Sequence, residues 1–102
     1  DYIKNGSLME LDEFMQSIKE DTPPEGLSEP LKAMWYARKS DWETAHNIAQ
    51  SIGTELGSWI HAYLHRVEGD LSNAGYWYKR AGKPQFQGST EAEADDIVNS
   101  IL

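Results

Sequence analysis

The stretch LGSWIHAYLHRVEGDLSNAGYWYKRAGKP, residues 56–84, decides the fold expected for this chain. Its first half places apolar residues at steps of three and four, the spacing of one face of an α-helix: Leu56, Trp59, Ile60, Tyr63, Leu64 and Val67. Gly69 is suited to end this helix, and Asp70 is a favourable N-cap for the next one. We therefore predict two helices, over residues 55–68 and 71–82, joined by a tight turn.

The same pattern occurs a second time in the chain. At an offset of 29 residues, five positions are identical: Leu27 and Leu56, Ala33 and Ala62, Asp41 and Asp70, Ala45 and Ala74, Gly53 and Gly82. Apolar positions, caps and stops match along with them, which predicts an earlier pair of helices over 29–39 and 41–52. The repeated unit is a helical hairpin, over 27–53 and again over 56–84, whose apolar faces need a neighbour to bury them.

Flanking segments complete the predicted domain. We expect helices over 8–19 and 91–101, so that residues 1–22 and 90–102 act as capping helices. Three capping boxes are predicted at helix starts: Ser7 with Glu10, Ser40 with Glu43, and Thr90 with Glu93. No segment alternates with a period of two for long enough to indicate a strand. The expected fold is one all-α domain, residues 1–102, with about six antiparallel helices.

Small, turn-forming and aromatic residues of the second unit follow one another in the order Ala62, Gly69, Asp70, Ala74, Tyr78, Ala81 and Pro84. In the first unit the equivalent places hold Ala33, Ser40, Asp41, Ala45, Ala49 and Ile52. This order resembles the tetratricopeptide repeat family over residues 27–84, and the resemblance implies a right-handed stack of helical hairpins. The unit departs from the family in its length, in Ser40 replacing the turn glycine, and in the early position of Pro84.

The resemblance also implies a concave face, lined by the first helix of each hairpin, that holds a peptide or a partner protein. Carried over residue by residue, this face contains Met34, Ala37, Arg38, Trp59, Tyr63 and Arg66. Arg38 and Arg66 stand where peptide-binding members carry cations that hold a carboxylate. The asparagines of those members are absent, because Met34 and Tyr63 take their places. We therefore predict an interaction module with an exposed patch of Trp59, Tyr63 and Arg66, and with no cofactor.

Composition restricts the classes of partner. The net charge of −8 repels phosphate at long range, which argues against general binding to nucleic acid or to an anionic membrane. A local basic cluster of Lys79, Arg80 and Lys83 is interpreted as complementing a helix C-terminus. The absence of cysteine excludes disulfides and thiolate ligands and fits a cytoplasmic location. No apolar stretch approaches the length of a membrane span.

A metal or small-molecule site is the alternative prediction. His61, His65 and Glu68 follow one another at steps of four and three on one line of a helix, and two histidines at such spacing can bind zinc. Ala62 follows His61, so the metalloprotease arrangement is absent. His46 could join His61 or His65 across the boundary between the hairpins. No phosphate-binding loop or nucleophile motif occurs, so an enzyme is not the first expectation.

A third possibility is a purely structural role as a homo-oligomer. In that case the apolar C-terminal helix would form the seam of a dimer.

Overall fold

The computed structural model describes residues 3–4 and 7–102 of the chain, and the side chains of residues 9–102. The elements in chain order are β1 (Ile3–Lys4), β2 (Ser7–Leu8), α1 (Leu11–Ser17), α2 (Glu29–Arg38), α3 (Trp42–Gln50), α4 (Glu55–Val67), α5 (Leu71–Arg80) and α6 (Thr90–Ile101). The predicted all-helical fold with six helices is confirmed for these residues, apart from the short antiparallel pair β1–β2. No helix among them is long and apolar enough to cross a membrane.

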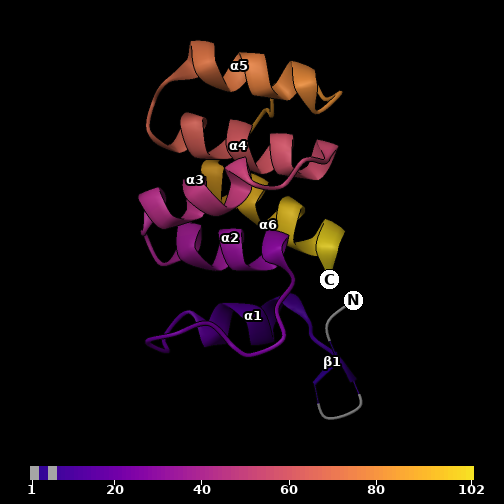
Figure 1. Cartoon of the computed structure of the whole chain (residues 1–102). Coiled ribbons are helices and arrows are strands. Elements are labelled where there is room, and N and C mark those ends of the chain that lie inside the picture. Colours follow the sequence, from indigo (N-terminus) through magenta and orange to yellow (C-terminus); the bar gives the residue numbers. More distant parts are fainter. Residues whose placement is uncertain (1–2, 5–6) are drawn as a thin grey trace.

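Helices α1 to α5 follow one another as layers, with α1 at one end and α5 at the other (Figure 1). The closest pairings are α2 with α3 and α4 with α5, which are the two predicted hairpins, and α3 packs on α4 to join them. Helix α6 returns along the stack and packs against α2 and α4. The chain thus folds as two hairpins whose first helices share α6 as a cover.

The two hairpins have the same turn. Ser40 after α2 and Gly69 after α4 both adopt positive φ angles, of 69° and 86°. Each is followed by an aspartate, Asp41 or Asp70, whose carboxylate accepts a hydrogen bond from the backbone three residues later. The offset of 29 residues therefore corresponds to a repeated turn geometry, in which Ser40 tolerates the left-handed conformation that favours glycine. The wider resemblance to tetratricopeptide repeats stays a prediction.

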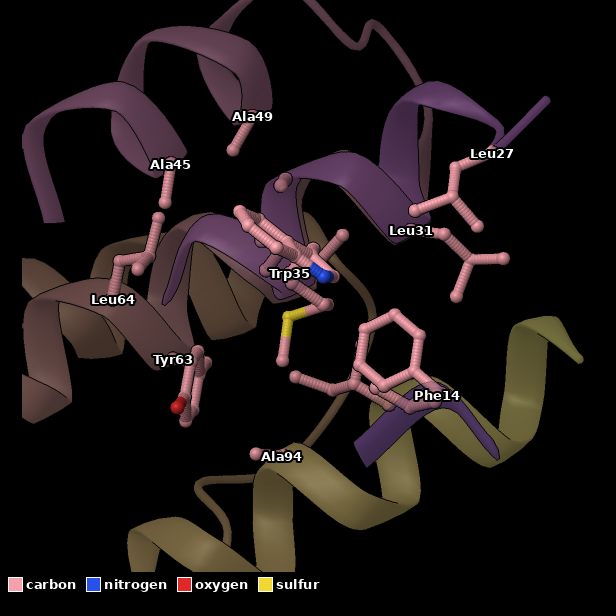
Figure 2. Close-up of a cluster of buried hydrophobic side chains, with 14 of the residues drawn as sticks. Phe14, Leu27, Leu31, Trp35, Ala45, Ala49, Tyr63, Leu64 and Ala94 are labelled. Carbon is pink, nitrogen blue, oxygen red and sulfur yellow. The ribbon is translucent and has the colours of Figure 1, made fainter. Parts of the chain in front are cut away.

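The main core lies where α2 meets α1, α4 and α6. Trp35 of α2 is fully buried, and Figure 2 shows Phe14 of α1, Leu64 of α4 and Ala94 of α6 around it. The indole Nε1 of Trp35 donates a hydrogen bond of 3.1 Å to Ser17 Oγ, so its one polar atom is satisfied inside the core. Trp35 therefore lies in one core with α1 from the beginning of the sequence and α6 from its end.

Two of the predicted capping boxes, at the starts of α1 and α3, were assigned to the wrong residues. Ser7 belongs to β2, and α1 begins three residues later than expected, with Glu10 as its N-cap. Ser40 takes the left-handed position of the turn and cannot act as the cap. Asp41 does so instead, and its carboxylate accepts a bond of 3.2 Å from the backbone of Thr44.

The third predicted capping box is also wrong. Ser89, rather than Thr90, caps α6 and accepts a bond of 3.0 Å from the backbone of Ala92. The shift by one residue moves Glu93 out of the reciprocal capping position. Its side chain is fully buried instead.

Gly57, in the first turn of α4, offers a test of the packing between α3 and α4. A Cβ atom at this position would lie 2.8 Å from Ile52 Cβ and in contact with the Ile52 carbonyl oxygen. We expect Gly57→Ala to lower the free energy of unfolding by about 2 kcal/mol, because overpacking outweighs the gain of about 1 kcal/mol in helix propensity. Denaturation in urea, followed by circular dichroism, measures the change.

Gly75→Ala in α5 is the matched control. Its Cβ would meet only the end of the Gln85 side chain, at 3.1 Å, which can move away. This variant should be neutral or slightly more stable than the wild type. Equal destabilisation by both substitutions would show that the contact with Ile52 is not the cause.

Candidate metal centre

Three histidines meet between the two hairpins. His46 comes from α3, whereas His61 and His65 lie one turn apart on α4 and share one face of that helix. One ring nitrogen of each residue can be chosen so that all three atoms lie within 4.8 Å of one another. The structure thus places His46 beside both His61 and His65, across the boundary between the hairpins.

The cluster is closely packed and mostly shielded from solvent. His61 and His65 are 4% and 7% exposed, and His46 is half-buried. The Nε2 atoms of His46 and His61 are 2.8 Å apart, so one of these nitrogens donates a proton to the other. The two facing nitrogen atoms therefore share one proton through a hydrogen bond.

Two tryptophans hold the imidazole rings in place. Trp42 stacks on His46, with ring centroids 4.7 Å apart and an interplanar angle of 11°, and its Nε1 donates a bond of 2.7 Å to the Leu64 carbonyl. On the other side, Trp77 of α5 stacks on His61 at 3.8 Å and 9°. The indoles restrict rotation of the two rings and keep water from their faces.

The environment favours neutral imidazoles. Burial, and then the neighbouring His46 and His65, lower the pKa of His61 from 6.5 to about 4. Burial and the proximity of His65 also lower the pKa of His46. At pH 7 both imidazoles are therefore mainly neutral. This is the form that binds a metal ion.

Glu68 contacts one histidine but lies outside the three-histidine set. Its Oε2 atom is 2.7 Å from Nδ1 of His65. The predicted set of His61, His65 and Glu68 is therefore corrected to His46, His61 and His65, because Glu68 lies at the C-cap of α4, beyond the turn that faces α3. A carboxylate on the far nitrogen of an imidazole fixes the orientation of the ring and raises its basicity.

A second acidic group lies beside this pair. Asp70, with His65 and Glu68, forms another cluster within 4.8 Å. Its carboxylate is already used as the N-cap of α5, where it accepts bonds from the backbone and the side chain of Asn73. We therefore assign Asp70 to the turn and not to the ligand set.

The predicted concave binding patch is largely covered, with Tyr63 buried and Trp59 and Arg66 half-buried. Tyr63 is 5% exposed, and Trp59 Nε1 and Arg66 Nη1 donate to the two oxygens of Glu93, at 3.1 and 2.8 Å. Arg38, in the first hairpin, pairs with Asp95 at 2.9 Å. Both arginines that were expected to hold a partner's carboxylate hold carboxylates of α6 instead. The expectation of an open patch is wrong because α6 packs on α2 and α4.

Glu93 is a residue whose importance the sequence reasoning missed. It is fully buried and also accepts a hydrogen bond of 2.5 Å from the hydroxyl of Tyr78 on α5. The available signal is that Glu93 lies four residues before Ile97 and next to Ala94, within the apolar stripe of the last helix. An acid within such a stripe faces the core.

The chain matches no protein-family model, no curated protein sequence and no solved structure.

Proposed function

We propose that this domain binds one divalent transition-metal ion, with zinc as the first candidate, through His46, His61 and His65. The observation that carries the proposal is the convergence of three imidazole nitrogens, from two hairpins, within 4.8 Å. Imidazole nitrogen is a common zinc ligand, and it also suits nickel and copper. A site made of three histidines and no thiolate agrees with the absence of cysteine from the chain.

The distances need only small ring movements to fit a tetrahedral ion. Zinc–nitrogen bonds of about 2.0–2.1 Å place two ligand nitrogens about 3.3 Å apart. The His46–His61 contact is shorter than this, at 2.8 Å, because a proton now lies between the nitrogens. When a metal ion binds, the donating imidazole would shift its proton to Nδ1, so that both Nε2 atoms can ligate while the two rings separate slightly and His65 moves in. The fourth position is left for water or for a group from another molecule.

Calorimetric titration with zinc and with nickel tests the proposal. We expect one ion per chain and a dissociation constant in the micromolar range or below. His46→Gln should weaken binding by about 100-fold or more, because it removes one of three ligands. His46 is half-buried, so its replacement disturbs the core less than replacement of His61.

Glu29→Gln is the matched control for this titration. Glu29 is an exposed acid on α2, paired with Lys32 at 3.0 Å and absent from both histidine clusters. Its replacement removes one negative charge without touching the proposed site, so the affinity should not change. Absence of binding to the wild type, or equal binding by wild type and His46→Gln, would overturn the proposal.

Binding to a protein partner is a second candidate function. The concave face supports it poorly, since a peptide would have to displace α6 together with Glu93 and Asp95. The observation that favours a partner lies elsewhere, on the outer face of α5. Tyr76 and Leu71 there are 55% and 62% exposed.

A further inference from the structure

The outer face of α5 has no neighbour within the described part of the chain. Helix α5 packs on α4 and forms one end of the stack (Figure 1). Large apolar side chains are nevertheless exposed there: Leu71 at 62%, Tyr76 at 55%, and Val67 at the end of α4 at 47%. The last helix of a helical stack normally has a polar outer face. On α5 the exposed apolar side chains lie among polar and basic residues.

This end of the molecule is basic, although the chain as a whole is acidic. The segment 71–89 contains Lys79, Arg80 and Lys83 and no acidic residue, whereas the net charge of the chain is −8. All three cations are exposed, and none forms an ion pair with a described residue. We call Leu71, Tyr76, Lys79, Arg80 and Lys83 the basic end.

The guanidinium of Arg80 is held on this surface by aromatic side chains. It lies 5.2 Å from the ring centroid of Trp77 and 5.8 Å from that of Tyr76, and its Nη1 donates a bond of 3.2 Å to the Tyr76 hydroxyl. A positioned arginine beside an exposed tyrosine is the kind of pair that dominates interface energies.

The opposite end of the stack is complementary in charge. Residues 10–29 contain seven acids and one cation, Lys19. Two cations, from α2 and its C-cap, also reach this segment: Lys39 donates to the carbonyl oxygens of Ile18 and Glu20, and Lys32 pairs with Glu29, so the acids remain in excess. Between α1 and the loop that follows it lies a groove of about 750 Å³, with Met9, Pro23 and Pro24 among its apolar lining and the exposed Glu20 and Asp21 among its acids. We call these five residues the acidic end. It offers a hollow with apolar walls, and the basic end offers a projecting helix.

We propose that a second copy of this chain docks head to tail, with its basic end seated on the acidic end of the first copy. Tyr76 and Leu71 would meet the apolar walls of the groove, and Lys79 and Arg80 would approach Glu20 and Asp21. Such a contact joins two different surfaces, so it can be repeated from copy to copy and need not close into a ring.

Two other occupants fit the observations less well. Nucleic acid would be repelled by the rest of the chain, which is even more negative than the total of −8. The C-terminal helix α6, which was predicted as a dimer seam, does not present Ile97 and Val98 as an apolar surface, because both are fully buried within one chain. The exposed apolar surface lies on α5 instead.

Sedimentation velocity over a range of protein concentrations tests the proposal, with a chelator present so that the result is independent of the metal site. At about 0.01 M salt the Debye length is about 30 Å, and we expect the average mass to rise with concentration beyond that of a dimer. At about 1 M salt the Debye length is about 3 Å, and the chain should be mainly monomeric. A wild type that stays monomeric in low salt at every concentration would overturn the proposal.

Charge-reversed variants identify the surfaces. Lys79→Glu with Arg80→Glu makes the basic end acidic, and Glu20→Lys with Asp21→Lys replaces the two exposed acids of the groove with cations, while residues 10–29 keep their five other acids. All four residues are exposed, so the fold should persist, which circular dichroism checks. Each double variant alone should be monomeric, whereas an equimolar mixture should associate. If the second variant still dimerises alone, contact between two α5 helices replaces the head-to-tail arrangement. A monomeric mixture would also contradict the proposal.

Discussion

Glu93→Ala is expected to lower the free energy of unfolding by about 3–5 kcal/mol, the usual cost of removing one partner from a buried ion pair. The carboxylate is fully buried and accepts bonds from Trp59, Arg66 and Tyr78. Burial, and then the bond to Glu93, raise the pKa of Tyr78, so that its hydroxyl keeps the proton that it donates. Without Glu93, three donors lose their acceptor, and Arg66 keeps an unpaired charge in a mostly buried position.

Asp95→Ala provides the matched control on the same helix. Asp95 also pairs with a mostly buried arginine, Arg38 at 12% exposed, but the Asp95 side chain is 43% exposed and accepts this one bond, so the expected loss is smaller, about 1–2 kcal/mol. Unfolding in urea, monitored by circular dichroism, compares the two variants with the wild type. A loss below about 1 kcal/mol for Glu93→Ala would mean that the buried network does not fasten α6 to α4 and α5. For a domain of ordinary stability, the predicted loss is a large part of the total.

Local features of the fold were predictable because they depend on neighbouring residues. The cap at Asp70 and the stop at Gly69 follow from short-range hydrogen bonds and from backbone freedom. The start of α6 was missed because Ser89 and Thr90 are adjacent hydroxyl residues, and either could cap a helix. The sequence pattern does not choose between them. The buried donors around Glu93 come from α4 and α5, so the choice is made by tertiary contacts.

The candidate metal centre was only partly predictable, for the same reason. The i, i+4 spacing on one helix places His61 and His65 together. Assigning His46, and moving Glu68 outside the ligand set, required knowing how α3 packs on α4. The concave face failed as a prediction because a family resemblance describes the lining of a groove and not the helix that fills it. Docking of α6 depends on long-range pairs such as Arg66 with Glu93.

Saturating zinc is expected to raise the thermal midpoint of unfolding by more than about 10 °C. An ion that binds only the folded state adds about 2.7 kcal/mol when its free concentration is about 100 times the dissociation constant. Each kcal/mol shifts the midpoint of a domain near this size by about 4–8 °C. Differential scanning calorimetry with zinc and with a chelator measures the shift.

Variants of the site residues should reduce this zinc-induced stabilisation to different extents, according to the role of each residue. His46→Gln, which loses a ligand, should show almost no shift with zinc. Glu68→Gln, which loses the group that orients His65, should show a shift reduced by about 1.4–2.7 kcal/mol at equal free zinc, corresponding to 10–100-fold weaker binding. Each variant is compared with itself in chelator, so that its own stability cancels. An equal shift in all three proteins would place the zinc elsewhere.

The position of the site also predicts which helices the bound ion stabilises. His46 belongs to the first hairpin, whereas His61 and His65 belong to the second, so a bound ion would tie α3 to α4. Amide hydrogen exchange should therefore slow in both helices when zinc is added, because opening either one breaks a metal bond. Protection confined to α4 would indicate that His61 and His65 bind the ion without His46. The metal would then not join the hairpins.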